Sequence, residues 1–382
     1  MVHPPSALPP PDPAAADHSA RLQRAIVEAI RATDGWIRFD RYMELALYTP
    51  GLGYYAAGAR KFGDWAAGGD FVTAPEISPL FASALATQVA QVFAHTPAHI
   101  VEFGAGSGVL ARDLLDALAA RGIAVARYAI VELSPDLAAR QRVLLEGRGV
   151  EWLTAPPRRF EGVMLANEVL DVMPVRLFVM RGRLPRERGV GLQGDALTWV
   201  DRDADAELRD AVSAIEREVG ELPDGYGSEI NFAGRAWMRS VADWLARGVL
   251  FAIDYGFPRR EYYHPQRLMG TLMCHYRHHA HADPLWLPGL NDITAHVDFT
   301  AMADAAHAAE LAVLGYTTQA HFLMNCGLLD QLGAGHSPRR ANEVQRLLSE
   351  AEMGELFKVL AVGRGVREPL VGFARGDRLA RL

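Results

Sequence analysis

The most constraining feature of this sequence is a glycine-rich turn between a short apolar run and a helical pattern. The apolar run covers residues 99–103 and contains one acid, Glu102; Gly104, Gly106 and Gly108 follow within five residues. Glycine removes side chains where a ligand and the backbone approach each other, and it permits tight turning. The pattern is typical of a parallel strand that passes beneath a nucleoside before a helix begins.

A second acid, Glu132, ends the next apolar run at residues 128–132. An acid at the tip of a second strand is placed to accept hydrogen bonds from ribose hydroxyls. Together the two patterns predict a nucleoside cofactor on a doubly wound α/β sheet.

The glycine spacing distinguishes between cofactors. A dinucleotide fingerprint, G-x-G-x-x-G, would need a third glycine at position 109, where the chain has Val109. The spacing G-x-G-x-G after an acid is typical of S-adenosylmethionine (SAM) sites; an acid suits the sulfonium and ammonium of SAM. NAD and a purely structural turn are the alternatives. We predict SAM, bound by residues of the turn and the strand ends: Glu102, Gly104, Ala105, Gly106, Gly108, Glu132 and Asn167.

Composition excludes several classes of protein. The net charge of −7 argues against broad nucleic-acid affinity. No apolar run is long enough to span a membrane. Two cysteines, Cys274 and Cys326, cannot build a disulfide framework, which fits a reducing compartment and predicts a cytoplasmic protein.

Proline, glycine and apolar periodicity divide the chain. We expect a disordered Pro-rich tail at 1–18, an N-terminal helical cap with a substrate loop at 19–95, and an α/β domain at 96–382. Ser78 or Glu76 is a candidate cap for a helix at 80–94, with Pro79 in its first turn. Expected strands are 99–103, 127–132, 150–154, 162–168 and 249–256. Insertions are expected at 175–232 and 257–298, and a terminal antiparallel hairpin at 357–362 and 370–374.

Four segments, residues 69–78, 101–108, 166–175 and 292–299, carry a resemblance to a known family. Over residues 20–375 the chain resembles the MidA-like SAM-dependent methyltransferases. The resemblance implies a class I methyltransferase fold and a protein substrate. Mitochondrial members are known as arginine methyltransferases that assist assembly of respiratory complex I, so N-methylation of an arginine is expected and a complex I subunit is a candidate substrate. The arginine-poor tail lacks an obvious mitochondrial presequence, which favours a bacterial member.

The expected chemistry lies beyond the carboxyl ends of the strands, where open α/β sheets bind ligands. One or two carboxylates can hold a guanidinium fork. We expect Glu168 and Asp171 in this catalytic role, with His296 relaying a proton. The remaining candidates contact the substrate: Asp70, Thr73, Pro75, Glu76, Asp254 and Tyr255. Glu168 as a helix-cap neighbour and His296 as a satisfied buried histidine are the alternatives.

A cluster at 274–281 contains one cysteine and four histidines. Zinc spacing is absent, and we expect no metal but polar side chains along an acceptor channel. If the segment were extended, His275, His279 and His281 would share one face. Tyr54, Tyr55 and Trp65 could form an aromatic wall for a cation, or pack in a core.

Two rival functions remain open from the sequence. One is an NAD-linked oxidoreductase. The other is a chaperone-like assembly factor that retains the SAM pocket without catalysis. The sequence does not indicate the oligomeric state.

Overall fold

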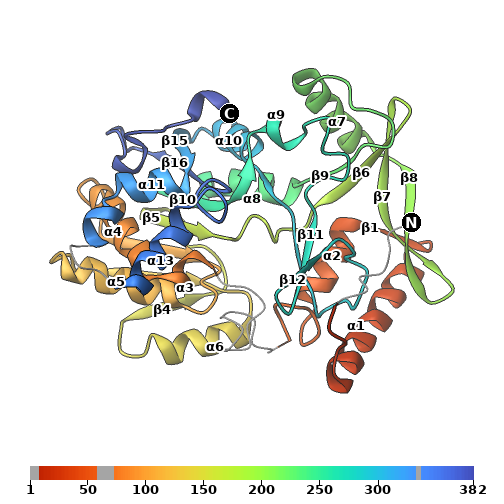
Figure 1. Ribbon diagram of the computed structural model, residues 1–382, viewed down its shortest axis with the longest axis horizontal. Coiled ribbons are helices and arrows are strands. Elements are labelled where there is room, and N and C mark those ends of the chain that lie inside the picture. Colours follow the sequence, from red (N-terminus) through yellow and green to blue (C-terminus); the bar gives the residue numbers. More distant parts are fainter. Residues whose placement is uncertain (1–7, 58–72, 333–336) are drawn as a thin grey trace. The chain divides into compact units, whose positions relative to one another are not determined.

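The computed structural model describes residues 8–57, 73–332 and 337–382 (Figure 1). The chain divides into two compact units. One unit contains residues 72–171, 235–258 and 297–382, and is here called the sheet unit. The other contains residues 1–71, 172–234 and 259–296, and is here called the cap unit.

The sheet unit is built on strands in the order β15-β16-β10-β5-β2-β3-β4. The neighbours from β10 to β4 pair in parallel, β16 is antiparallel to β10, and β15 is antiparallel to β16. A short strand, β14, pairs in parallel with the end of β10. The strands are β2 (His99–Phe103), β3 (Arg127–Val131), β4 (Val150–Leu153), β5 (Phe160–Asn167), β10 (Leu245–Phe257), β14 (Val297–Asp298), β15 (Ala312–Thr318) and β16 (Phe357–Arg364). This order and these directions confirm the predicted class I methyltransferase sheet.

Helices cover both faces of this sheet (Figure 1). Side chains of β2 point to opposite faces of the sheet. Ile100 packs in the core with α4 and α5 on one face, while Phe103 packs on Trp237 and Trp244 of α8 on the other. The helices of the unit are α3 (Ala74–Ile77), α4 (Pro79–Phe93), α5 (Val109–Ala120), α6 (Pro135–Leu144), α8 (Phe232–Trp244, which begins in the cap unit), α10 (Phe299–Ala308), α11 (Gln319–Asn325), α12 (Leu328–Leu332) and α13 (Pro338–Leu348), with 3-10 turns η2 (Val371–Phe373) and η3 (Leu379–Arg381).

Local sequence explains where several of these helices begin. Ser78 caps α4 and Ser134 caps α6, each followed by a proline at the first helical position, as in α13 after Ser337. The predicted cap at Ser78 is therefore confirmed.

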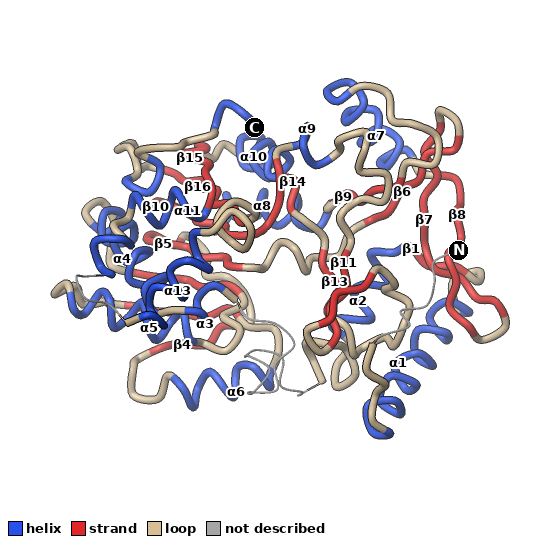
Figure 2. Tube along the Cα trace, in the orientation of Figure 1, coloured by secondary structure: helices blue, strands red, loops and turns tan. Residues whose placement is uncertain are grey.

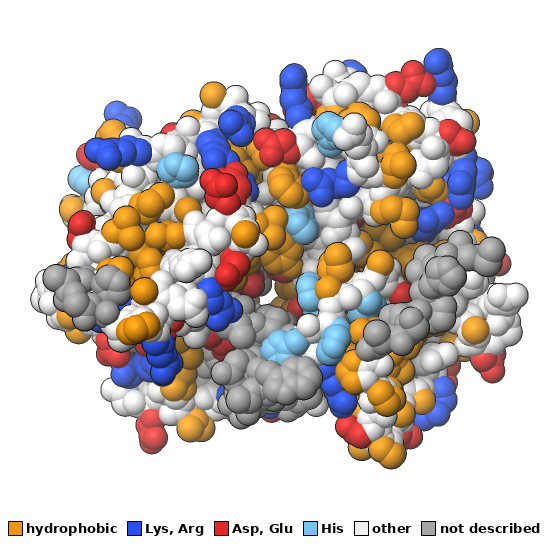
Figure 3. Space-filling model, viewed as in Figure 1, with side chains coloured by type: hydrophobic (Ala, Val, Ile, Leu, Met, Phe, Trp, Pro, Cys, Tyr) orange, Lys and Arg blue, Asp and Glu red, His pale blue; other side chains and the backbone are white. Residues whose placement is uncertain are grey.

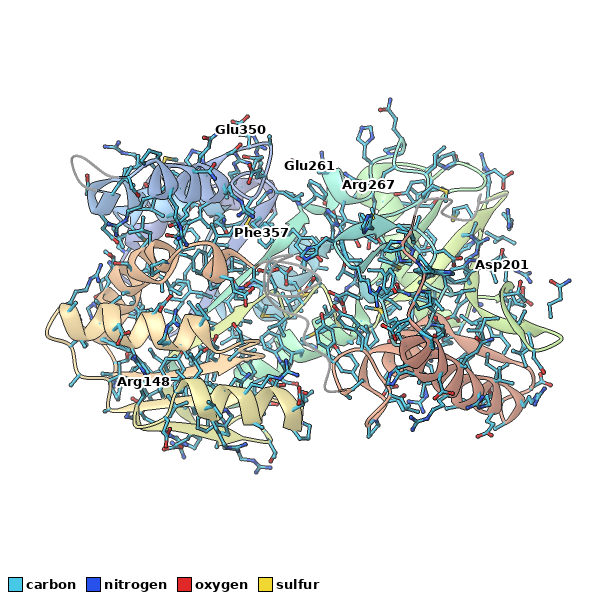
Figure 4. The ribbon with its side chains drawn as sticks, turned by 60° about the horizontal axis from the view of Figure 1, so that its bottom comes forward. Arg148, Asp201, Glu261, Arg267, Glu350 and Phe357 are labelled. Atoms are coloured by element: carbon cyan, nitrogen blue, oxygen red, sulfur yellow. The ribbon has the colours of Figure 1, made fainter. Side chains whose placement is uncertain are left out.

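Arg148, labelled in Figure 4 and shortly after the end of α6, forms an ion pair of 2.5 Å with Asp116 of α5.

The cap unit contains a five-stranded antiparallel sheet, β1-β7-β6-β9 with β8 on β7, and a three-stranded sheet, β12-β11-β13 (Figure 2). Its strands are β1 (Trp36–Arg38), β6 (Arg176–Arg181), β7 (Leu184–Gln193), β8 (Ala196–Asp203), β9 (Gly227–Ile230), β11 (Met273–Tyr276), β12 (His279–His281) and β13 (Asp292–Thr294). Its helices are α1 (Pro13–Arg31), α2 (Phe39–Tyr48), α7 (Ala206–Val219) and α9 (Arg259–Tyr262). The apolar stripe of α1, with Leu22, Ile26 and Ile30, packs in its core with α2.

The N-terminal prediction was wrong in one respect. Helix α1 begins at Pro13, not near Ser19, because the Asp12 side chain accepts a hydrogen bond of 2.9 Å from the Ala15 backbone and Pro13 fits the first helical position. Residues 13–18 are therefore helical, although the proline content of 1–18 indicated a disordered tail.

The predicted terminal hairpin was also wrong. Strand β16 covers 357–364, but its antiparallel partner is β15, and residues 371–373 form a 3-10 turn. Side chains of α4 bind the backbone N–H groups of this segment: Gln91 accepts from the Val371 N–H, and Gln88 accepts from the Gly372 N–H. These bonds hold the segment against α4 instead of in the sheet.

Unit boundaries differ from the expected sequential domains. Residues 73–95, expected in the cap, belong to the sheet unit, where α4 contacts α5 and β5. The N-terminal residues join the two inserted segments in the cap unit.

Two surface properties follow from the described residues. None of the helices in these ranges is both long enough and apolar enough to cross a membrane. On the face drawn in Figure 3, Lys and Arg are interspersed with Asp and Glu.

Candidate functional site

The glycine turn joins β2 to α5 in the conformation that the sequence predicts. Gly104, Gly106 and Gly108 have φ values of 58°, 53° and 85°, in the left-handed region that side chains disfavour. The Gly108 N–H donates to the Ala105 carbonyl at 2.7 Å, and α5 begins at Val109. A Cβ on Gly104 would lie 3.3 Å from a methyl carbon of Val169, so the turn is tightly packed.

Glu102 lies at the end of β2 and is only 2% exposed. Its carboxylate accepts a hydrogen bond of 2.7 Å from the hydroxyl of Tyr128 on β3. Burial raises the pKa of Glu102 to about 7; the Tyr128 bond opposes that rise, and the charge of Glu132 adds to it. Glu102 therefore titrates near neutrality.

Glu132 follows β3 at the same edge of the sheet. One carboxylate oxygen accepts from the Ser134 N–H at 2.8 Å, and the other accepts from the Gln141 amide at 3.0 Å. Burial raises the pKa of Glu132, while these hydrogen bonds oppose the rise.

The sequence reasoning missed Gln141, which contacts the predicted cofactor residues. Its amide also donates to the Gly106 carbonyl at 2.9 Å and accepts from the Trp152 indole at 3.0 Å. Its burial shows only in the structure: Gln141 lies beside Leu137 and Ala138 on the buried face of α6, where a polar side chain requires partners.

The next strand end forms a tight turn at residues 168–171. Glu168 follows β5 with φ of 54°, unusual for a residue other than glycine, and its N–H donates to the Ile253 carbonyl at 2.9 Å. Asn167 Nδ2 donates to the Glu168 carboxylate at 3.2 Å. The other amide atom, Asn167 Oδ1, is buried and has no hydrogen-bond partner among the described residues.

Asp254 fixes this turn from β10. Its carboxylate accepts from the backbone N–H groups of Leu170 and Asp171, at 2.9 and 3.3 Å, and from its neighbour Tyr255 at 3.0 Å. Asp254 is 1% exposed, and burial with the charges of Asp171 and Glu168 holds its pKa well above the usual range. These contacts show a structural role; contact with substrate stays a prediction.

Tyr255 connects the same turn to the antiparallel part of the sheet. Its hydroxyl donates to the Asp171 carboxylate. Its ring meets Phe357 of β16, labelled in Figure 4, edge-on with centroids 5.3 Å apart. Asp171 and Tyr255 are therefore in direct contact.

Helix α3 brings part of the expected substrate segment to Glu168. The Ala74 backbone N–H hydrogen-bonds Glu168, and the Glu76 charge acts on it. Burial, then the charges of Asp171 and Glu76, raise the pKa of Glu168 to about 8, against the lowering effect of the Asn167 and Ala74 bonds. Thr73 and Pro75 flank Ala74. Asp70 and Trp65 lie outside the described residues.

His296 belongs to the cap unit, where its backbone N–H donates to the Thr271 hydroxyl at 2.9 Å. Its proposed proton relay stays a prediction. The surrounding segment has structural roles: Asp292 accepts from the Tyr55 hydroxyl at 2.8 Å, and Asp298 caps α10.

The tyrosines of the expected aromatic wall pack within the cap unit. Tyr54 is buried and meets Tyr55 edge-on, and the Tyr48 ring stacks on Tyr55 at 5.8 Å. The core-packing alternative thus accounts for both rings.

The histidine cluster forms a hairpin, so the prediction of one shared face was wrong. Cys274 pairs with His281 and Tyr276 with His279, while His275 pairs with Ala280 on the opposite face. The chain reverses at Arg277 and His278, both with positive φ. His281 bonds Asn291 at 3.1 Å. Within the described ranges no group of three or more His, Cys, Asp or Glu side chains could hold a metal ion.

Comparison with known proteins agrees with this geometry. The model of a family described as "Putative S-adenosyl-L-methionine-dependent methyltransferase" matches residues 84–317. The chain is similar to a Burkholderia thailandensis protein solved with S-adenosyl-homocysteine, with 50% identity, a TM-score of 0.94, and coverage of 98% of this chain and 100% of that one.

More distant relatives carry more specific names. The chain is 27% identical to "Protein arginine methyltransferase NDUFAF7, mitochondrial" of Danio rerio, over 90% of this chain and 88% of that protein. The Mus musculus protein of the same name is 28% identical, over 92% and 86%. The cofactor is therefore SAM and not NAD, and the chain belongs to the MidA-like family of SAM-dependent methyltransferases.

Proposed function

We propose that this methyltransferase N-methylates an arginine of a protein substrate, with Glu168 and Asp171 holding the guanidinium. The observation that carries the proposal is the tight turn after β5, which keeps these two carboxyl groups close enough for the charge of Asp171 to raise the pKa of Glu168. The names of the distant relatives support arginine as the acceptor.

The residues at the strand ends suit the cofactor. When bound, SAM supplies a methyl group activated by its sulfonium. The glycine turn carries no side chains that would block a ligand, and the Glu132 carboxylate is suited to ribose hydroxyls. Asn167 Oδ1 is a buried acceptor to which no described residue donates. Glu102 supplies negative charge for the cationic part when ionised.

Glu168 has two protonation states with different uses. With a pKa of about 8 it is mostly neutral in the free protein at neutral pH. An arriving guanidinium favours the carboxylate, so the Glu168 proton leaves to solvent as the cation binds. The ionised pair accepts N–H bonds from the fork and holds one nitrogen toward the methyl donor.

Asp254 and Tyr255 act behind these groups. Asp254 holds the 170–171 backbone, and Tyr255 fixes the Asp171 carboxylate. Aligned groups of this kind lower the barrier because they need no reorganisation during transfer.

Mass spectrometry of cellular proteins tests the proposal. We would compare wild type, a strain without the gene, and strains carrying Glu168→Gln or the exposed-site control Glu146→Gln. At least one methylarginine peptide is expected in wild type and the control, and in neither of the other two strains. Methylation lost at a residue other than arginine would contradict the acceptor assignment.

The same strains distinguish an assembly factor that works without catalysis. If the Glu168→Gln protein corrects the defect of the deletion strain without restoring any methylation, the function is binding and not methyl transfer. A complex I subunit as substrate and a cytoplasmic location stay predictions.

A further inference from the structure

The buried amide of Gln141 connects two parts of the cofactor site that are distant in sequence. Gln141 is 0% exposed on α6. Its Nε2 donates to Gly106 of the glycine turn and to Glu132 after β3, at 2.9 and 3.0 Å.

Trp152 fixes which way the amide faces. The indole can only donate, so the Gln141 oxygen must be the atom that accepts its hydrogen bond at 3.0 Å. The nitrogen then faces two acceptors, the Gly106 carbonyl and the Glu132 carboxylate. The flipped amide would place oxygen against both acceptors, with no proton between them.

The hydrogen bonds to Glu132 leave its carboxylate able to accept a further hydrogen bond from a ligand. Ser134 and Gln141 donate to different oxygens of Glu132, and the Leu133 backbone N–H also hydrogen-bonds this carboxylate, so these three donors do not fill its roughly four acceptor positions. These bonds together hold the carboxylate plane against rotation. The ribose would therefore meet a carboxylate that is already oriented, without the entropic cost of ordering a free side chain.

We infer that Gln141 is a positioning residue for the ribose of the cofactor, acting through Glu132 and, by its second bond, on the glycine turn. The inference rests on the ribose role proposed above for Glu132. The alternative is that Gln141 merely satisfies buried groups where α6 packs, in which case its loss would change the stability of the fold and not ribose recognition.

A double-mutant cycle separates these alternatives. Calorimetry would measure the affinities of S-adenosylhomocysteine and its 2′,3′-dideoxyribose analogue for four proteins: wild type, Gln141→Met, Glu132→Ala and the double variant. Gln141→Met is expected to weaken the binding of S-adenosylhomocysteine about tenfold, which is the scale of one hydrogen bond to a charged group. It should change affinity for the dideoxy analogue about twofold at most, and have little effect in the Glu132→Ala background.

Two further variants guard against a folding defect. Trp152→Phe removes the donor to the amide oxygen, together with part of the ring, and should weaken S-adenosylhomocysteine binding less than Gln141→Met does. Gln141→Glu keeps the size but faces Glu132 with a second carboxyl, so its binding should weaken further as pH rises. Melting of each free variant shows whether it is folded.

The outcomes distinguish the inference from its premise. Equal losses for both ligands, or an undiminished Gln141→Met effect without Glu132, would overturn the positioning role. If Glu132→Ala binds S-adenosylhomocysteine as well as wild type, the ribose role of Glu132 fails, and the inference with it.

Discussion

The hydroxyl of Tyr128 donates a hydrogen bond of 2.7 Å to the carboxylate of Glu102, across neighbouring parallel strands in the interior of the sheet unit. This bond stabilises the ionised acid, whose pKa burial raises to about 7. Tyr128 therefore favours the charged form of Glu102, which we propose as a cofactor-binding residue.

Tyr128→Phe should raise the pKa of Glu102 further, by about one unit, because a bond that favours the charged form is lost. In wild type, SAM affinity should rise as pH increases through about 7, where Glu102 ionises. The variant should show the same rise at higher pH. Calorimetric titrations across pH measure the midpoint, and Tyr42→Phe, at a buried tyrosine of the cap unit, is the control. An unchanged midpoint in Tyr128→Phe would refute the coupling.

Gly106→Val should remove SAM binding, because the turn would carry a branched side chain at a φ of 53° where the ligand approaches. Gly122→Val is a matched control: its φ is 73°, and an added Cβ there would meet nothing within 4 Å. Both variants should melt at lower temperature, since both impose the same kind of backbone strain. Only Gly106→Val should lose the upward melting shift with S-adenosylhomocysteine. A retained shift would show that the turn does not contact the cofactor.

Stability of the free protein should fall as pH rises from about 5 to 8. The pKa of Glu168 is about 8 when folded, against an ordinary 4.5, so over this interval the folded state binds a proton that the unfolded state has lost. The stabilisation is complete below pH 4.5 and is lost as pH rises toward 8. Glu168→Gln mimics the neutral acid and should flatten part of this decline, with Glu102 accounting for another part. Urea unfolding at several pH values measures how the free energy of unfolding changes with pH. Equal slopes in wild type and Glu168→Gln would contradict a raised pKa of Glu168.

Tyr255→Phe should lower turnover about tenfold while SAM affinity stays within about twofold. The variant keeps the ring contact with Phe357 but leaves Asp171 without the hydroxyl that orients it. Steady-state kinetics with the acceptor protein, beside calorimetry, gives both quantities. A loss of SAM affinity equal to the loss of turnover would place Tyr255 at the cofactor instead.

Much of the sheet was predictable because each parallel strand is a short apolar run with a polar end. The run at 99–103 coincides with β2, and Glu102, near the end of β2, and Glu132, just after β3, lie at one edge of the sheet. Strand β15 was missed because residues 312–318 carry a register shift beside Gly315, where a Cβ would meet the Phe373 ring at 2.4 Å. A close approach of that kind depends on tertiary packing.

The site was less predictable than the fold for the same reason. Glu168 and Asp171 share a turn in the sequence, so their proximity could be inferred. The backbone contacts of Asp254 and the bridge made by Gln141 depend on which way buried side chains face across strands and helices. The hairpin at 277–278 escaped detection because Arg277-His278 is not one of the Asn-Gly, Asp-Gly or Gly-Gly pairs that mark a two-residue hairpin turn.

Single-turnover methyl transfer by Glu168→Gln tests the central claim most directly. Glutamine keeps the size and much of the hydrogen bonding of Glu168 but cannot ionise when the cation binds. With the cognate protein as acceptor, we expect turnover to fall by two orders of magnitude or more, on the order of the 3 kcal/mol that an aligned electrostatic group supplies. SAM affinity should stay within a few-fold. Turnover equal to that of wild type would contradict a role for Glu168 in holding the acceptor.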